Sequence, residues 1–574
     1  MKSEGVTELL LLSCPSKVID YPALALPALT GFLKKRNVSV LQKDLNIEVK
    51  MLFLKKENLD YLFHIGIPYF VRVNMTNEAE HQKLMQFYNI LKKVNTESSF
   101  NELQELIELC QSRKYGFLKE KRKANLMNTI FDISKCFDFF ISYICLYYDE
   151  IEKNGLFPFF TQYIRNTTEE ILEENPKIIG FSIITTQNTF SIWYSQFLKK
   201  NSKYKGWILF GGAHPTKYKE QFLYDNPHID FIITGEGEMS LYQLVTMLRK
   251  GEKNFSEIPR LIYRNELEIK KNTNSKFLTD CYKTDFPCYD GLPLDLYLSP
   301  IFPIISSSNC PWKKCKFCAH KTSFREDYNE RDPEDVVNEM EYMYQKYGTR
   351  LFHFADETIS AEHGARIGEM ISERKLPFFW MSFGRLDDEF NEDNLKKWYQ
   401  GGARIVEWGL ESGSEKILNG MNKGIHIKKA QEIMHIAGTL GIKNKLLTWH
   451  NYPKEELDDL IKTINFVEKN VKSGFSATML TLKQKLVLQV GSELYEETFY
   501  KKENRDDFYK VWLPGSIYSI NAKYYCKYSA DEEKKMLIEL YLKDMIKYCN
   551  EKDIFIASNE NISFDLILTQ LKEG

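Results

Sequence analysis

Three cysteines lie close together between Ser306 and His320, in the run SSSNCPWKKCKFCAH. Cys310, Cys315 and Cys318 have the spacing C-x4-C-x2-C, and the short step lets two thiolates from one turn reach neighbouring metal atoms. Iron–sulfur cubanes are normally held by four cysteines, so three leave one iron open to a small chelating ligand. We therefore expect this run to hold a [4Fe–4S] cluster.

Two other interpretations of the three cysteines stay open. A zinc site needs a fourth ligand, for which His320 is the local candidate. Alternatively, the three residues are ordinary core thiols. A disulfide is disfavoured, because three is an odd number and nothing else in the chain indicates secretion.

The composition indicates a large globular protein. With 574 residues, 43% of them hydrophobic, the chain has room for two to four domains with cores of their own. A net charge of −2 gives no reason to expect a nucleic-acid partner. No apolar run approaches the ~20 residues of a membrane span, and the N-terminus does not have the pattern of a signal peptide. We expect a reducing, cytoplasmic setting.

The first part of the chain has the pattern of a doubly wound parallel sheet. Strands are predicted at 6–13, 38–45, 177–185, 207–210 and 230–234. Between the second and third strands, residues 48–175 have Leu, Phe, Tyr, Lys and Glu at helical spacing and few glycines, which predicts a helical insertion. This insertion is either a lid or substrate wall, or a cap over one edge of the sheet.

Small and polar residues follow the last three of these strands. They are Thr185, Thr186, Gln187, Gly211, Gly212, His214, Thr216, Gly235, Glu236, Gly237 and Glu238. Ligands of open α/β sheets bind at the carboxyl ends of the strands, and glycines let the backbone approach a large ligand closely. The pattern therefore predicts a ligand site, although tight strand–helix turns use the same residue types.

The second part alternates strands and helices again. Strands are predicted at 301–307, 351–355, 378–383, 404–410, 445–449 and 477–482. Polar residues follow the strands: Asp356, Glu357, Arg385, Glu411, Ser412, His450 and Tyr452. About six such units predict an incomplete barrel whose active face is its carboxyl end, where the cysteine run also lies. Helix caps and surface ion pairs are the alternative roles of these polar residues.

Several segments resemble radical SAM enzymes, and in particular the branch with an N-terminal cobalamin-binding domain. The segment 290–318, DGLPLDLYLSPIFPIISSSNCPWKKCKFC, is similar to the entry into their barrel, although C-x3-C-x2-C is the commoner spacing there. The run ARIVEWGLESGSEKILNGMNKG resembles the strand–turn–helix that helps to hold S-adenosylmethionine (SAM). GGAHPT and TGEGE are similar to two loops that cradle cobalamin.

The resemblance implies an α/β protein of two main domains. They are a Rossmann-like, doubly wound cobalamin-binding domain at 1–250 and a partial (β/α)6 TIM barrel, the radical SAM domain, at 296–499. A linker at 251–295 joins them, and a small helical cap follows at 500–574.

The resemblance also implies three cofactors: the [4Fe–4S] cluster, SAM and cobalamin. Asp356, Glu357, Arg385, Glu411 and Ser412 would then hold SAM, and the three loops of the first sheet would hold cobalamin. The motif D-x-H-x-x-G, whose histidine ligates cobalt in many other cobalamin proteins, is absent. His214 is then expected near the cofactor, as a loop residue without a bond to cobalt.

The implied activity is that of a cobalamin-dependent radical SAM C-methyltransferase acting on an unactivated carbon of a peptide or small-molecule natural product. A 5′-deoxyadenosyl radical and methylcobalamin would drive it, with an electron donor such as flavodoxin or ferredoxin. His450 and Tyr452 stand where relatives have a G-x-P turn, and are the candidate catalytic residues. Oxidation, cyclisation or rearrangement without methyl transfer is one alternative, and a non-catalytic corrin- or cluster-binding module is another.

Overall fold

The predicted strands form two sheets in two compact units, which meet in the chain between Ser299 and Pro300. The computed structural model describes residues 7–72, 78–266, 268–273, 285–319, 328–473, 484–499, 508–512, 522–526, 531–551 and 562–573. Among the helices within these ranges, none is both long and apolar enough to cross a bilayer. Each unit is described by itself below.

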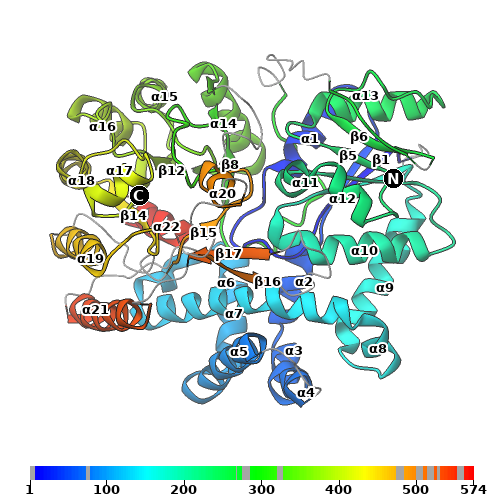
Figure 1. The fold of residues 1–574 in the computed structure, drawn as a ribbon, viewed down its shortest axis with the longest axis horizontal. Coiled ribbons are helices and arrows are strands. Elements are labelled where there is room, and N and C mark those ends of the chain that lie inside the picture. Colours follow the sequence, from blue (N-terminus) through cyan, green and yellow to red (C-terminus); the bar gives the residue numbers. More distant parts are fainter. Residues whose placement is uncertain are drawn as a thin grey trace. The chain divides into compact units, whose positions relative to one another are not determined.

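The first unit contains a sheet with the strand order β2-β1-β3-β4-β5-β6-β7 (Figure 1). The strands are β1 Leu9–Ser13, β2 Val40–Asp44, β3 Ile178–Ser182, β4 Trp207–Gly211, β5 Phe231–Ile233, β6 Leu261–Asn265 and β7 Glu268–Lys271. The first five are parallel, in the doubly wound order 2-1-3-4-5, and the direction in which successive strands are added to the sheet reverses between β1 and β3. The fold class predicted from the sequence is confirmed.

Helices cover both faces of this sheet. They are α1 Ala25–Lys34, α10 Asn188–Lys200, α11 Ala213–Tyr218, α12 Glu220–Asp225 and α13 Glu238–Arg249, with the short 3-10 helix η3 Thr185–Gln187. Alternate strand residues such as Leu9, Leu11 and Val40 pack with Phe32 of α1 and Leu244 of α13 into one buried cluster. Because both faces of the sheet are covered, central strands such as β1 and β3 are buried along nearly their whole length.

The strands β6 and β7 lie within the predicted linker at 251–295, in the run IPRLIYRNELEIKKN, whose pattern predicts a polar hairpin. They form an antiparallel hairpin that pairs with β5 through Ile262 and Ile232, and so extend the first sheet. The backbone of Cys288 also bonds to Pro27 of α1. Residues that the sequence suggested as a connection therefore belong in good part to the first unit.

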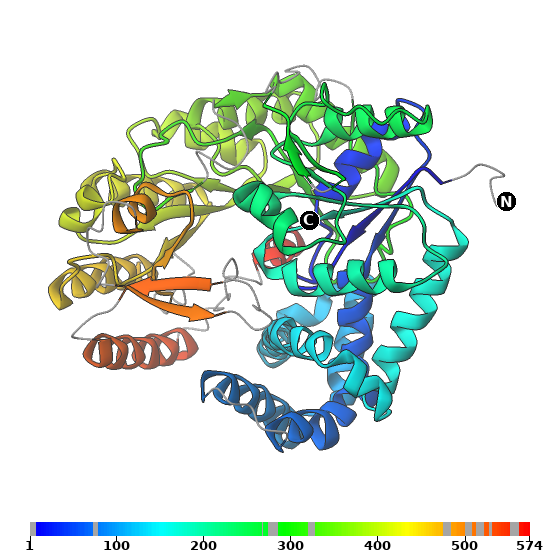
Figure 2. The same ribbon diagram turned by 45° about the vertical axis from the view of Figure 1, so that its right-hand side comes forward.

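The helical insertion between β2 and β3 is present. Its helices are α2 Leu45–Leu54, α3 Lys56–Tyr61, η1 Leu62–Gly66, α4 Ile67–Arg72, α5 Glu78–Glu97, α6 Phe100–Gln111, η2 Tyr115–Lys119, α7 Lys121–Leu146, α8 Tyr148–Lys153 and α9 Pro158–Glu173. The ring of Phe53 lies 5.3 Å from that of Phe137 and 5.7 Å from that of Phe160, measured between centroids. Aromatic rings thus fill part of the core of this insertion. Its helices are drawn in blue to cyan in Figure 2.

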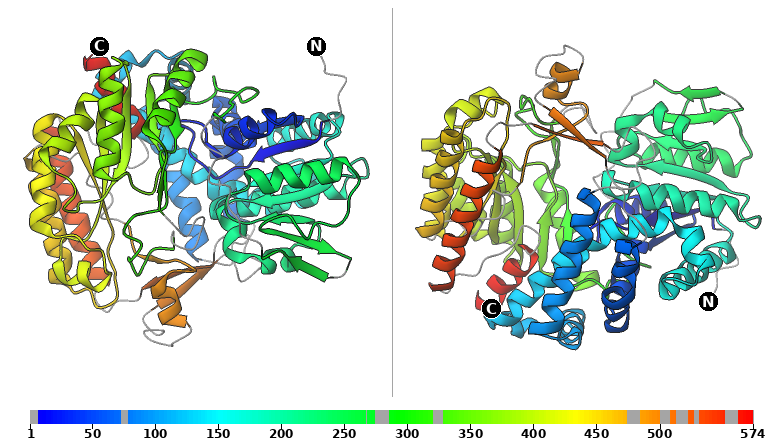
Figure 3. Two further views of the ribbon diagram at one scale, coloured as in Figure 1. Left: turned by 90° about the horizontal axis from the view of Figure 1, so that it is seen from above. Right: turned by 60° about the horizontal axis from the view of Figure 1, so that its bottom comes forward.

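The second unit contains a parallel sheet with the order β14-β13-β12-β11-β8. The strands are β8 Ile301–Ile304, β11 Leu351–Phe354, β12 Phe379–Gly384, β13 Ala403–Glu411 and β14 Lys443–Thr448. The helices between them are α14 Pro333–Tyr347, α15 Ala361–Glu373, α16 Glu392–Gln400, α17 Glu415–Gly420 and α18 Ile427–Leu440, and α19 Leu457–Lys472 follows β14. Figure 3 shows these green-to-yellow helices along one side of the sheet.

The predicted sixth strand at 477–482 lies outside the described residues. Directly after it, the backbone of residues 484–486 pairs in parallel with His450, whose N–H donates to Gln484 and whose carbonyl accepts from Leu486. The parallel arrangement therefore continues past β14, as an incomplete barrel requires.

The C-terminal segment differs from the purely helical cap predicted for 500–574. It has the helices α20 Glu493–Phe499, α21 Asp531–Glu551 and α22 Ile562–Glu573, but also a small antiparallel sheet of β15 Val487–Leu488, β16 Phe508–Trp512 and β17 Ala522–Cys526. Arg404, at the start of β13, bonds with Glu573, and Lys443, at the start of β14, bonds with Asp565. These contacts place α22 at the amino ends of the strands, the end opposite the cysteine run.

Candidate active site

The cysteine loop starts just after β8 and is anchored by Asp356, which follows β11. The Asp356 carboxylate accepts bonds from the Ser306 backbone at 3.0 Å, the Ser306 hydroxyl at 3.1 Å and the Ser307 hydroxyl at 2.7 Å, and from the Ser307 backbone. Burial raises the pKa of Asp356 to about 6, and these serine bonds oppose the rise. Its bonds thus support a role in anchoring the loop, and its contact with SAM stays a prediction.

The three cysteines are free thiols on the loop that follows. Cys315 is buried, and Cys310 and Cys318 are half-buried. The N–H of Cys318 donates to the carbonyl of Cys315 at 3.2 Å. The two residues between these cysteines therefore lie in a tight turn, as the short spacing predicted. Among the described residues, no three His, Cys, Asp or Glu side chains are gathered as ligands of a single metal ion.

Residues 421–424, between α17 and α18, are bonded directly to the cysteine loop. The Trp312 indole donates to the carbonyl of Asn422 at 2.8 Å, and the N–H of Lys316 donates to that of Met421 at 2.9 Å. Gly424 has a φ of +67°, and a Cβ built there would lie 2.1 Å from the Trp312 ring. This segment therefore fixes the loop that carries the cysteines.

Arg385, Glu411 and Trp449 bring three strand ends to the same place. The Arg385 guanidinium lies 5.0 Å from the centroid of the Trp312 ring and donates to the carbonyl of Lys423 at 2.7 Å. Glu411 accepts from the Trp449 indole at 2.6 Å and from the Lys423 ammonium at 2.8 Å. The sequence predicted Arg385 and Glu411 here, and the structure brings both to the cysteine loop.

The backbone at Glu411 is unusual for a non-glycine residue. Its φ is +67°, in the left-handed region, and the pairing of β13 with β14 shifts register between Gly409 and Glu411. Such a bulge re-aims a side chain, and strained residues cluster at functional sites. The Glu411 side chain is thereby directed to Trp449 and Lys423.

Two other predicted residues have structural partners. Ser412 is 1% exposed; its hydroxyl lies 3.2 Å from that of Thr463 on α19 and accepts from the N–H of Ser414. This hydroxyl supports the turn after β13, and the role of Ser412 in holding SAM stays a prediction. Glu357 is half-buried beside Asp356.

The two candidate catalytic residues lie after β14. The His450 ring lies 2.9 Å from the Asn451 side-chain oxygen and is 3% exposed. The Tyr452 hydroxyl donates to the carbonyl of Gly420 at 2.8 Å, and burial raises its pKa. Because this hydroxyl is engaged and mostly buried, Tyr452 supports the turn next to residues 421–424, and its catalytic role stays a prediction.

In the first unit, the loop after β3 is tied to the loop after β1. The Thr186 hydroxyl donates to the carbonyl of Ser16 at 2.8 Å, and the Gln187 amide donates to that of Cys14. The Gln187 side chain also accepts from the N–H of Ile184. These two loops flank the point where the strand order reverses, which is where ligands of such sheets bind.

The loops after β4 and β5 are joined through Thr216. Its hydroxyl donates to the carbonyl of Gly212 at 2.7 Å and accepts from the N–H of Gly235 at 2.9 Å. Gly212 has a φ of +95°, and a Cβ there would lie 2.6 Å from the carbonyl oxygen of Ile183. A side chain at position 212 would therefore clash with the loop after β3. The other predicted residues of these two loops are half-buried along the same edge: Gly211, Glu236, Gly237 and Glu238.

His214 is fully buried beneath these loops. Its Nδ1 lies 3.2 Å from the Thr185 hydroxyl, and its ring packs 4.7 Å from Tyr218 and 5.6 Å from Phe222. Burial lowers its pKa to about 3, so the ring is neutral. Such a histidine supports the loop from below.

Two apolar side chains are exposed at the reversal point of the first sheet. Val18 follows β1 and Ile184 follows β3, and each is 43% exposed. Exposed apolar groups beside glycine-rich loops fit a large planar ligand with an apolar face. The exposed apolar side chains and the glycine-rich loops therefore fit a corrin here. In the second unit, three thiols beside Lys423 and Arg385 fit an anionic cluster.

Two family models match parts of the chain, one in each unit. The model of the radical SAM superfamily matches residues 304–467, and the model of the B12-binding domain matches residues 160–245. The chain thus joins a B12-binding domain to a radical SAM domain. The cysteine loop begins the radical SAM match, and the β3, β4 and β5 loops lie within the B12-binding match.

Individual proteins are similar over part of the chain. An uncharacterised methyltransferase of Pyrococcus horikoshii is 26% identical over 300 residues, which are 51% of this chain and 64% of that protein. An anaerobic magnesium-protoporphyrin IX monomethyl ester cyclase of Synechocystis is 24% identical over 248 residues, 42% of this chain and 49% of that one. The chain thus spans less than two thirds of these relatives.

A solved structure shares the fold of the two domains. The radical SAM methyltransferase TsrM from Kitasatospora setae, with cobalamin and a [4Fe–4S] cluster bound, superposes with a TM-score of 0.58 at 14% identity. The match covers 88% of this chain and 80% of that one. At this identity the likeness concerns the fold alone.

Lys423 and Trp449 are site residues that sequence reasoning missed. Trp449 is the last residue of the strand predicted at 445–449, whereas only polar residues that follow a predicted strand were considered as site residues. Lys423 lies in the turn NGMNKG, well past its strand. Only the fold of residues 421–424 onto the cysteine loop brings it to the site.

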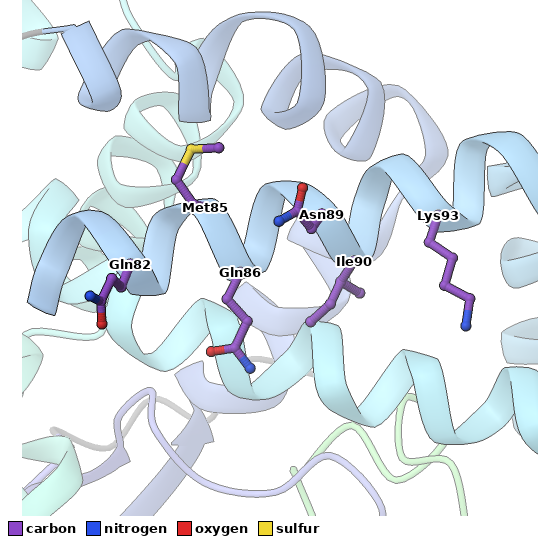
Figure 4. A pocket seen from close by; sticks show the side chains of 6 residues that line it. All are labelled: Gln82, Met85, Gln86, Asn89, Ile90 and Lys93. Carbon is purple, nitrogen blue, oxygen red and sulfur yellow. The ribbon is translucent and has the colours of Figure 1, made fainter. Parts of the chain in front are cut away.

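A groove of about 510 Å³ lies elsewhere, along α5 in the helical insertion. It is lined by Gln82, Met85, Gln86, Asn89, Ile90 and Lys93, and Figure 4 shows these side chains on one helix. None of the predicted site residues lines it.

Proposed function

We propose that this protein is a cobalamin-dependent radical SAM C-methyltransferase that acts on an unactivated carbon of a peptide or small-molecule substrate. The observation that carries the proposal is the meeting of Arg385, Glu411 and Trp449 with a three-cysteine loop at the carboxyl ends of a parallel sheet. Three cysteines leave one iron for SAM, and charged strand-end groups suit its amino-acid and ribose parts.

The radical SAM domain would hold the cluster and SAM through distinct groups. Cys310, Cys315 and Cys318 would bind iron, and the walls of the loop are aromatic: Phe317 packs 5.2 Å from Trp449. Glu411 is the group best placed to accept hydrogen bonds from SAM, because its carboxylate lies beside this loop. Excluding water around such a site protects a reactive radical from side reactions.

The B12-binding domain would hold cobalamin over the loops after β1, β3, β4 and β5. Val18 and Ile184 would pack on the corrin, and the half-buried Gly235 and Gly237 leave room for it. His214 is enclosed by Tyr218 and Phe222, so cobalamin would be bound without a histidine bond to cobalt.

The bound cofactors supply the difficult chemistry: reductive cleavage of SAM generates a carbon-centred radical, and methylcobalamin carries the methyl group. This chain positions them, excludes water and orients the substrate. An electron donor of the flavodoxin or ferredoxin type is part of the proposal. A reducing compartment such as the cytoplasm is also part of it, since the cysteines in the described residues are free thiols.

Anaerobic reconstitution tests the proposal. We expect purified protein to bind iron, sulfide and one corrin, and to release 5′-deoxyadenosine from SAM when a strong reductant is added. The variant C310A/C315A/C318A should bind the corrin but form no 5′-deoxyadenosine. A product that gains one CH₂ unit per turnover identifies methyl transfer.

Cyclisation is a second candidate, favoured by one observation: relatives named as cyclases match the chain, including that of Synechocystis. A product that loses hydrogen and gains no carbon would identify it. Protein that binds a corrin and a cluster but never cleaves SAM would instead be a non-catalytic module.

A further inference from the structure

Lys423 occupies a buried position between the cysteine loop and Glu411. Its ammonium donates to the Glu411 carboxylate at 2.8 Å and lies 5.8 Å from the centroid of the Phe317 ring in the cysteine loop. Lys423 is 6% exposed and Glu411 is 9% exposed. A lysine with so little exposure pays a large desolvation cost, which its carboxylate partner offsets only in part.

The backbone of Lys423 is fixed from three sides. Arg385 donates to its carbonyl at 2.7 Å, and the neighbouring Asn422 carbonyl accepts from Trp312 at 2.8 Å. Gly424, on its other side, packs so closely on the Trp312 ring that no side chain fits there. Lys423 therefore cannot move away from the cysteine loop without breaking the contacts that hold the loop.

The charges around the cysteine loop explain why a cation is needed at this place. The Lys423 ammonium lies 5.8 Å from the centroid of the Phe317 ring, and the Arg385 guanidinium lies 5.0 Å from that of the Trp312 ring, so two cations face this loop. If the loop binds an anionic cluster, the buried Glu411 carboxylate adds a second negative charge nearby. Unpaired, that carboxylate would disfavour any further electron on the cluster.

We propose that Lys423 is a positioning residue that keeps a positive charge beside the Glu411 carboxylate at the cysteine loop, and so makes a cluster in this loop easier to reduce. This inference rests on the proposed function, since it assumes that the loop binds the cluster. Net charge close to an iron–sulfur cluster is one of the factors that set its reduction potential. A purely structural ion pair, in contrast, would change stability and leave the potential unchanged.

The test is a redox titration of the reconstituted cluster, followed by electron paramagnetic resonance. We expect K423M to shift the midpoint potential to more negative values, on the order of a tenfold change in the ratio of oxidised to reduced cluster, or about 59 mV for one electron. K423R should stay close to the wild-type value. The control K472M removes a lysine whose partner is Glu468 on the surface of α19, and should also leave the potential unchanged.

A variant that removes the negative charge should shift the potential in the direction opposite to K423M. The test therefore does not depend on whether any one variant folds. E411Q removes the negative charge and should shift the potential in the positive direction, and K423M/E411Q should return towards wild type. Equal potentials in K423M, E411Q and wild type, all with full iron content, would overturn this inference alone. Wild-type protein that takes up no iron would overturn the proposed function together with it.

Discussion

The indole N–H of Trp449 donates to the Glu411 carboxylate at 2.6 Å, and this bond joins the ends of β14 and β13 beside the cysteine loop. Both residues come just after or at the end of neighbouring parallel strands, whose carboxyl ends meet at one edge. The other oxygen of the same carboxylate is held by Lys423. Glu411 is thus oriented from two sides before any ligand binds, which is the preorganisation that an active site requires.

Removing the indole donor should weaken SAM binding. Because hydrogen bonds to charged groups contribute about 1.5–3 kcal/mol, we expect W449F to raise the dissociation constant of SAM by roughly 10- to 100-fold. Isothermal titration of the reconstituted protein with SAM measures this. W398F, which removes an indole bond to Ala361 inside the helical layer, is the control and should alter stability only. Unchanged SAM affinity in W449F would show that Glu411 does not contact SAM.

The close packing of Trp312 on Gly424 predicts a specific sensitivity to a single methyl group. G424A combines an unfavourable φ with a direct clash, and we expect it to lower the free energy of unfolding by about 1–3 kcal/mol and to reduce iron uptake. Urea unfolding and iron content are the measurements.

Gly348 provides the matched control for that variant. It has a φ of +73° at the end of α14, but nothing lies within 4 Å of the position of a Cβ. G348A should therefore show only the backbone cost and keep full iron content. If both variants lose iron equally, the contact with Trp312 does not fix the cysteine loop.

Much of the fold follows from the sequence, because each buried strand is an apolar run that ends in small or polar residues. Arg385 and Glu411 were found in this way. Asp356 was found too, but its partners Ser306 and Ser307 reach it only after β8 and β11 pair. The roles of such residues depend on which neighbours the fold supplies, and this is why their presence was predictable and their function was not.

The C-terminal region shows the same limit. Its charged helical pattern predicted a helical cap, whereas β16 and β17 form because the two segments can pair with each other. Pairing between segments separated in sequence leaves a weaker local signal than helical periodicity. Lys423 escaped notice for a related reason: its partner Glu411 is twelve residues away, across α17.

The pKa of Asp356 predicts a dependence of stability on pH. Its folded pKa of about 6 lies above the ordinary value of 3.8 for an aspartate, so the folded state retains the proton over a window in which the unfolded state has lost it. The contribution to stability is fully present below about pH 4 and is lost as the pH rises through about 6.

We therefore expect wild-type protein to lose up to ~3 kcal/mol of unfolding free energy from this group as the pH rises from about 4 to 6, at ~1.4 kcal/mol per unit of pKa shift. D356N has no such titration, so the difference in stability between variant and wild type should change across that window. Urea unfolding at several pH values measures it, and a constant difference would contradict the assignment.

A buried ion pair joins the C-terminal helix α21 to the loop after β14. The Lys534 ammonium, in a fully buried residue, donates to the Glu455 carboxylate and to the Glu455 carbonyl, each at 3.0 Å, and Glu455 in turn accepts from the N–H of Asn451. K534M leaves this carboxylate buried without its cation, so we expect a loss of about 3–5 kcal/mol of unfolding free energy.

The double variant K534M/E455L tests whether that loss comes from the uncompensated charge. It should recover a large part of the stability, because an apolar pair replaces the charged one. Chemical unfolding of the single and double variants gives the comparison. Equal stabilities of K534M and K534M/E455L would mean that the cost lies in lost packing of α21.

The most direct test of the account is the metal and corrin content of protein prepared without oxygen, compared with that of C310A/C315A/C318A. The account predicts that the wild type binds an iron–sulfur cluster and a corrin and forms 5′-deoxyadenosine from SAM, and that the triple variant keeps the corrin but loses both iron and cleavage. Wild-type protein that binds zinc in place of iron, or takes up no corrin, would contradict it.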